Sequence, residues 1–78
     1  MEYDNLIKES AHIAVQYSQA SPSLFQRKLK MGYNRAHRIM EQLEELKVIG
    51  VSKGAKARDI LFSDPNELSE HLRQIGII

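Results

Sequence analysis

The chain has 78 residues, of which 42% are hydrophobic and 27% charged, with a formal net charge of +1 and no cysteine. This composition is typical of one small globular domain, and it excludes a disordered chain, a disulfide-stapled fold and a thiolate metal site. No apolar run approaches the ~20 residues that span a bilayer, and residues 1–4 lack the features of a signal peptide, so we expect a cytoplasmic protein without a membrane segment.

The first expected helix runs from Asp4 to roughly Gln19, with Asp4 or Asn5 as its N-cap. Its apolar positions form a broad stripe that favours packing against a core: Leu6, Ile7, Ile13, Ala14 and Tyr17. His12 lies among them, and a lone histidine is far more often a structural side chain than a ligand, because a metal site needs several converging ligands. The expected role of this helix is structural.

Ser21 and Pro22 predict the start of a second helix, because serine caps a helix N-terminus and proline suits the first helical position. This helix is expected to run to about Lys30 and to bury its apolar side chains, Leu24, Phe25 and Leu29. Met31 and Gly32 then make a tight break, since glycine accepts backbone angles that other residues resist.

The third expected helix, Gly32 to Leu46, has two faces of different chemistry. At ~100° per residue its apolar positions fall on one side: Ala36, Ile39, Met40, Leu43 and Leu46. The opposite side carries Asn34, Arg38, Glu41 and Glu45. Asn and Arg match the major-groove edges of adenine and guanine, and a helix fits that groove. Two short helices joined by a glycine-containing turn, the second with a polar face, indicate a helix-turn-helix with a recognition helix.

Two segments after this helix, residues 47–51 and 58–62, are predicted strands because they are rich in β-branched and other apolar residues. The turn between them, residues 52–57, carries Lys53 and Lys56 and no acid. A basic hairpin directly after a helix-turn-helix indicates a wing, whose lysines are expected along phosphates or a minor groove. The alternative is that these lysines only keep the loop solvated.

A last helix is expected to begin after Asp64, because a capping aspartate, Pro65 and Glu67 form a capping-box arrangement. Its apolar face comprises Leu68, Leu72 and Ile75, and Gly76 ends it. This acidic helix is expected to pack beside the wing or the first helix, or to serve as a surface for a partner.

The expected fold class is therefore α+β and mainly α. Residues 1–62 are predicted to form a winged helix-turn-helix of three helices and a β-hairpin wing. Residues 63–78 are predicted to add a C-terminal helical extension packed on that domain.

Charge is distributed unevenly along the chain. Residues 21–58 hold nine Lys and Arg residues against three glutamates, whereas residues 1–20 and 59–78 are both net acidic. A basic block on a compact domain is expected of a polyanion binder. A merely solvated surface with clustered lysines is the alternative, because charge alone carries no base-reading information.

Several short motifs are distinctive enough to compare with a known family. They are Phe25-Gln26-Arg27, Gly32-Tyr33-Asn34-Arg35-Ala36, Arg38-Ile39, Glu41-Gln42-Leu43-Glu44, Val48-Ile49-Gly50 and the stretch from Gly54 to Leu61. Together they closely resemble the gamma domain of the FtsK/SpoIIIE family of bacterial DNA translocases, over roughly residues 4–62. The resemblance implies a winged-helix domain that reads short G-rich polar sequences in double-stranded chromosomal DNA and thereby orients a translocase motor. In the FtsK branch it also implies contact with a tyrosine recombinase.

The resemblance assigns base reading to Asn34, Arg38 and Glu41, the residues that helical periodicity places on one face. In this interpretation Arg38 donates to guanine O6 and N7, and Asn34 contacts a purine edge. Glu41 either accepts from a cytosine amino group or orients Arg38 through a salt bridge. The family's basic positions fall on Arg35 and on two residues of the wing, Lys56 and Arg58. The full set of expected phosphate contacts is Arg27, Lys28, Lys30, Arg35, Lys53, Lys56 and Arg58.

The chain departs from the family pattern in three respects. His37 stands where the family usually has alanine, which makes that edge of the face bulkier or pH-sensitive. Residues 63–78 are expected to have no counterpart, because family members usually end near the wing. The chain also contains no phosphate-binding Gly-x-x-x-x-Gly-Lys-Ser/Thr loop, so it carries no motor.

The leading hypothesis is a non-enzymatic module that binds double-stranded DNA sequence-specifically, without cofactor or metal. It is expected to be monomeric in isolation, with several copies able to occupy adjacent DNA sites. The alternative is a protein-interaction module that docks a recombinase or another DNA-processing partner. An enzyme is disfavoured, because the sequence has no nucleotide loop and no nucleophile signature, and because His12, His37 and His71 do not form a ligand cluster by spacing.

Overall fold

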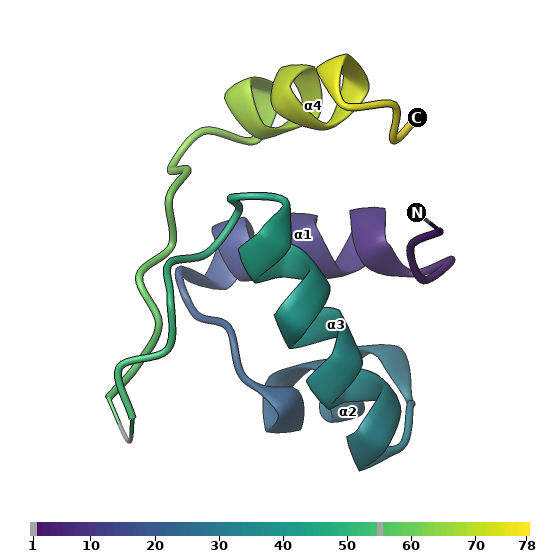
Figure 1. Ribbon diagram of the computed structural model, residues 1–78, viewed down its shortest axis with the longest axis vertical. Helices are drawn as coiled ribbons and strands as arrows, with labels where there is room; N and C mark the ends of the chain where they lie inside the picture. Colours follow the sequence, from purple (N-terminus) through teal and green to yellow (C-terminus); the bar gives the residue numbers. More distant parts are fainter. Residues whose placement is uncertain (1, 55) are drawn as a thin grey trace.

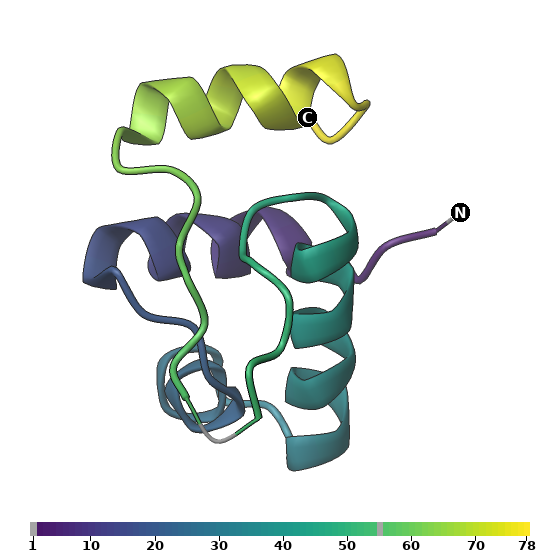
Figure 2. The ribbon, with the colours of Figure 1, turned by 60° about the vertical axis from the view of Figure 1, so that its left-hand side comes forward.

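The computed structural model describes residues 2–54 and 56–78, and over these residues it is mainly helical. Its helices are α1 (Ile7–Tyr17), α2 (Pro22–Leu29), α3 (Tyr33–Glu45) and α4 (Pro65–Gln74). α2 packs against α3, and α1 packs against α2, α3 and α4. Figure 1 shows α1 crossing the upper part of α3, with α4 above α1, and Figure 2 shows α4 following α1 along its length. Within the described residues no helix is long and apolar enough to cross a membrane.

The predicted starts of α2 and α4 are confirmed. The Ser21 hydroxyl accepts a hydrogen bond from the Leu24 N–H at 3.2 Å, and Pro22 occupies the first helical turn. Asp64 caps α4 in the same way, by accepting from the Asn66 N–H at 2.8 Å. These caps could be read from the sequence because each satisfies a free N–H of the first turn with a side chain from the same segment.

The predicted start of α1 is wrong by three residues. The helix begins at Ile7, and its N-cap position is Leu6, which makes no side-chain cap. Asp4 closes a turn before the helix instead, because its Oδ1 accepts from the Leu6 N–H at 2.8 Å and its carbonyl accepts from the Ile7 N–H at 2.9 Å. The carboxylate predicted to cap α1 therefore lies ahead of the helix.

The first three helices end slightly earlier than predicted, and a residue in left-handed backbone conformation follows each, directly after α1 and α2 and one residue later after α3. These residues are Ser18 (φ 50°), Lys30 (φ 56°) and Lys47 (φ 64°). α4 ends as predicted at a glycine: Gly76 has φ 91°, and the Ile77 N–H donates to the Leu72 carbonyl at 2.8 Å. Such a turn satisfies carbonyl groups that the helix itself leaves unbonded.

The helices share one apolar core. All five apolar positions predicted on the third helix are buried: Ala36, Ile39, Met40, Leu43 and Leu46. Leu24 and Phe25 of α2 and Leu68 and Leu72 of α4 are buried as well. Tyr17 and Ile75 were predicted to belong to apolar faces but are 44% and 41% exposed, because each lies at or beyond the last turn of its helix.

The predicted hairpin of residues 47–51 and 58–62 is not formed as two strands in the described residues. The chain doubles back, but its pairing consists of two isolated antiparallel bridges, Ile49 with Ile60 and Lys53 with Lys56. Val48 and Ile49 are buried, whereas the segment beyond them has no core to cover. Since a lone two-stranded ribbon is marginally stable, pairing is confined to the base and the tip. Ala55, at the predicted wing tip, lies outside the described residues. We call residues 48–61 the basic loop.

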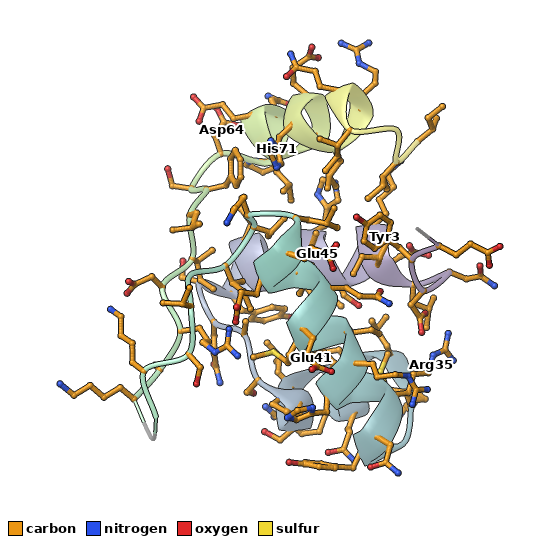
Figure 3. All side chains as sticks on the ribbon, viewed as in Figure 1. Tyr3, Arg35, Glu41, Glu45, Asp64 and His71 are labelled. Atoms are coloured by element: carbon orange, nitrogen blue, oxygen red, sulfur yellow. The ribbon has the colours of Figure 1, made fainter. Side chains whose placement is uncertain are left out.

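α4 is also attached to the end of α3. The His71 Nε2 lies 2.7 Å from the Leu46 carbonyl oxygen, so this ring nitrogen donates to the last turn of the helix. The His71 ring packs against Phe62, with 4.9 Å between ring centroids. Figure 3 shows His71 on the side of α4 that faces α3. The half-buried His12 of α1 has a similar structural contact, with its Nε2 3.4 Å from the Ser69 hydroxyl.

Candidate nucleic-acid interface

The side of α3 opposite the core carries four exposed polar residues, which we call the polar face: Asn34, Arg38, Glu41 and Glu45. Glu41 and Glu45 lie on the side of α3 that is turned toward the viewer in Figure 3. Among the described residues, the side chains of Asn34 and Arg38 make no hydrogen bond or ion pair. An amide and a guanidinium without internal partners can both donate to an external ligand.

Arg35 lies on one flank of the polar face and has an internal partner. Its Nε and Nη2 donate to the two carboxylate oxygens of Asp4 at 2.9 and 2.8 Å. The Asp4 side chain is only 15% exposed, and the Asp4 N–H donates to the Gln42 side-chain oxygen at 2.9 Å. The hydrogen bond from Arg35 lowers the pKa of Asp4 below its ordinary value of 3.8, against burial, which raises it. Arg35, predicted to contact a phosphate, thus holds the N-terminal segment to α3.

Arg58 is held in a similar way on the opposite flank. Its Nη1 donates to the Glu44 carboxylate at 2.8 Å and to the Gly50 carbonyl at 2.9 Å. The Arg58 side chain is 16% exposed. One guanidinium therefore joins both arms of the basic loop to α3. We call Asp4–Arg35 and Arg58–Glu44 the flanking pairs.

Glu41 has a weaker contact with a neighbour on its own helix. Its carboxylate lies 3.9 Å from the Nδ1 of His37, and both side chains are more than half exposed. No ion pair joins Glu41 to Arg38 among the described residues. The structure therefore offers His37, and not Arg38, as the partner of this carboxylate. Tyr33, 59% exposed, lies next to the His37 ring with 6.0 Å between centroids. Tyr33 was not among the predicted DNA-contacting residues, although it stands within the Gly-Tyr-Asn-Arg-Ala motif.

The other predicted phosphate-contacting residues are exposed lysines and an arginine. Arg27, Lys28 and Lys30 lie at the end of α2, where the Lys28 ammonium sits 4.8 Å from the centroid of the Tyr17 ring. In the basic loop, Lys53 forms an exposed ion pair with Asp59 at 2.7 Å. Lys56 is exposed as well. The predicted set thus divides into cations that hold the fold and cations that face solvent.

A groove of about 380 Å³ separates α3 from the basic loop. Tyr33, His37 and Met40 line it from α3, and residues 19–22 also contribute to its lining. Its far wall includes Lys56 and Arg58. The groove therefore places cationic and aromatic side chains next to the polar face. Among the described residues, no three His, Asp or Glu side chains lie together as a possible metal site.

Comparisons of the chain with a family model and with curated proteins point to the same family. The family model of the Ftsk gamma domain matches residues 1–63. The DNA translocase FtsK of Clostridium tetani is 52% identical over 60 residues, or 77% of this chain and 8% of that protein. Its counterpart in Chlamydia pneumoniae is 46% identical over 66 residues, or 85% of the chain and 8% of that protein.

The DNA translocase FtsK of Chlorobaculum tepidum is 38% identical over 72 residues, or 92% of this chain and 9% of that protein. Only six of the 78 residues lie outside this match. The match therefore includes residues 7–72, whether the six residues are missing at one end or divided between both. It therefore extends into α4, so residues 63–72 have a counterpart in this relative, contrary to expectation, whereas the family model ends at residue 63. The chain spans less than a tenth of the length of these relatives. The family model and the relatives agree, and the chain belongs to the FtsK gamma domain family.

Proposed function

We propose that this chain is a winged-helix module that binds double-stranded DNA sequence-specifically by inserting α3 into the major groove. The observation that carries the proposal is the polar face of α3, where Asn34 and Arg38 are exposed and have no internal partner among the described residues. Arg38 would donate to guanine O6 and N7 and Asn34 to a purine edge. Glu41 would accept from a cytosine amino group.

The basic loop would act as the wing. Its two arms run side by side in both views (Figure 1 and Figure 2), and the Gly50 N–H donates to the Asp59 carbonyl at 2.8 Å. Lys53 and Lys56 would contact phosphates, together with Arg27, Lys28 and Lys30. The exposed pair of Lys53 with Asp59 would exchange readily for a phosphate, because such pairs contribute little stability. Arg35 and Arg58 would instead hold the flanks of α3.

The relatives are named as DNA translocases. By analogy, the module would read short G-rich polar sequences of chromosomal DNA in the cytoplasm and so orient a translocase motor. Several copies on adjacent sites would raise the avidity of a domain that is monomeric in isolation. A tyrosine recombinase is the protein partner that the family suggests.

Arg38→Ala tests the base-reading role. The variant is expected to lose ~1 to 3 kcal/mol of discrimination between a G-rich duplex and a scrambled duplex, because one bidentate base contact disappears. Fluorescence titration of both duplexes at two salt concentrations measures this. An equal loss on the two duplexes would contradict base reading by Arg38.

Lys56→Ala is the matched control for Arg38→Ala. It should weaken binding to both duplexes similarly, because a phosphate contact carries no sequence information. It should also reduce the magnitude of the slope of log Kobs against log salt concentration by ~1. No measurable binding by the unmodified chain at low salt would overturn DNA binding altogether, and it would favour a protein-interaction module.

A further inference from the structure

Arg35 is the cation next to the polar face whose position suits a DNA backbone contact but whose Nε and Nη2 already donate to Asp4, although its side chain is 41% exposed. At ~100° per residue it lies ~100° around α3 from Asn34, beside the face and not within it. Its guanidinium forms two parallel hydrogen bonds with Asp4, at 2.9 and 2.8 Å. This forked geometry is also the one by which arginine binds a phosphate. Asp4 and a phosphate bound in this forked geometry would therefore compete for Nε and Nη2.

Asp4 is fixed for this contact by its own segment. Its N–H donates to the Gln42 side chain at 2.9 Å, and its Oδ1 accepts from the Leu6 N–H at 2.8 Å. The pKa of Asp4 is lowered by the Arg35 hydrogen bond, by the Leu6 N–H and by the charges of Arg35 and Arg38, so the carboxylate is ionised at neutral pH. The competitor is therefore charged and anchored to α3 before DNA arrives.

We infer that Asp4 is a positioning residue of the DNA interface, which keeps Arg35 away from phosphates and so limits the sequence-independent part of the affinity. The inference depends on the proposed DNA binding by α3. A phosphate contact strengthens binding to every sequence alike and increases its salt dependence. While Arg35 is bound to Asp4, Arg38 makes its base contact, and Arg35, one turn away on α3, adds no phosphate contact of its own.

The test is a double-mutant cycle of Asp4→Asn and Arg35→Ala, with scrambled duplex DNA as the probe. Asparagine keeps an oxygen for the Leu6 N–H but removes the charge that holds Arg35. The slope of log Kobs against log salt concentration should steepen by ~0.9 in the Asp4→Asn variant, because one additional phosphate is neutralised. In the Arg35→Ala background the same substitution should leave the slope unchanged. This comparison removes the general effect of deleting a negative charge.

If the unmodified chain binds DNA, three outcomes would overturn the inference alone. The slope of Asp4→Asn could equal that of the unmodified chain, or it could steepen equally with and without Arg35. Alternatively, Arg35→Ala alone could reduce the slope by ~0.9, which would mean that Arg35 contacts a phosphate while Asp4 is present. If circular dichroism shows that the Asp4→Asn variant is unfolded, the slope measured for Arg35→Ala alone still tests whether Arg35 contacts a phosphate. An absence of binding by the unmodified chain would overturn the proposed function together with this inference, whereas normal binding with an unchanged slope would overturn this inference alone.

Discussion

The flanks of α3 and the polar face between them use charged side chains in opposite ways. On the flanks, Arg35 and Arg58 donate at least two hydrogen bonds each to other segments of the chain. On the polar face, Arg38 is exposed and has no internal partner among the described residues. The flanking pairs fix the N-terminal segment and the basic loop against α3. The face between them is left free for an external ligand.

This contrast shows that a cation count does not measure the charge available to an external anion. Releasing Arg58, whose side chain is 16% exposed, or separating Arg35 from Asp4, whose side chain is 15% exposed, leaves polar groups unsatisfied, which is costly. Releasing an exposed lysine from a carboxylate costs little, because water solvates both charges. The basic block of the sequence therefore holds two kinds of cation: those whose hydrogen bonds hold other segments to α3, and those that can give up their contacts without a change in the fold.

The largest expected effect on stability is that of Arg58→Ala. It removes two hydrogen bonds, leaves the Gly50 carbonyl unsatisfied, and should lower the free energy of unfolding by about 1.5 to 3 kcal/mol. Urea unfolding followed by circular dichroism measures the change. Lys56→Ala, two residues away and exposed, should stay within about 0.5 kcal/mol of the unmodified chain. Equal destabilisation by the two substitutions would remove the distinction between flank and surface cations.

A smaller effect is expected from the other flanking pair, and it should depend on pH. The pKa of Asp4 is lowered in the fold. The stability that its charge contributes is therefore present above about pH 3.8 and is lost as the pH falls through the pKa of Asp4 in the folded chain. Asp4→Asn should therefore be less stable than the unmodified chain at pH 7. The two stabilities should converge in acid, because protonated aspartic acid and asparagine carry the same charge.

Unfolding of both proteins by urea at pH 7 and at several pH values below 4 gives the comparison for Asp4. Arg35→Ala should converge with the unmodified chain over the same pH range, since it removes the other half of the same pair. A difference that persisted unchanged in acid would show that Asp4 contributes through its turn before α1 and not through the ion pair.

The smallest expected effect belongs to the pair on the polar face. Glu41→Gln removes an exposed contact with His37 at 3.9 Å and should change the free energy of unfolding by less than about 0.5 kcal/mol. Thermal melts at pH 7 measure it. A loss as large as that of Arg58→Ala would mean that Glu41 also supports the fold, and the polar face would then not differ from its flanks.

Local features of the sequence predicted most of the helical structure. Ser21 and Asp64 cap their helices as expected, because capping involves residues only two or three positions apart. The start of α1 was missed because Asp4 has two possible uses, as a helix cap or as a partner for Arg35, and the second lies outside its own segment. The two predicted strands do not form in the described residues, and the sequence could not show this, because apolar composition does not tell how far the core extends beneath the hairpin.

The sequence by itself determined that α3 has a buried side and a polar side, since both follow from the 3.6-residue period of one continuous segment. It also contained the motifs that place the chain in its family. Only the tertiary structure decided which cations are available. The partners of Arg35 and Arg58 are 31 and 14 residues away along the chain, and their proximity depends on how the N-terminal segment and the basic loop pack against α3. Charge is a property of a residue, whereas its availability to an external ligand is set by what the folded chain brings within hydrogen-bond distance.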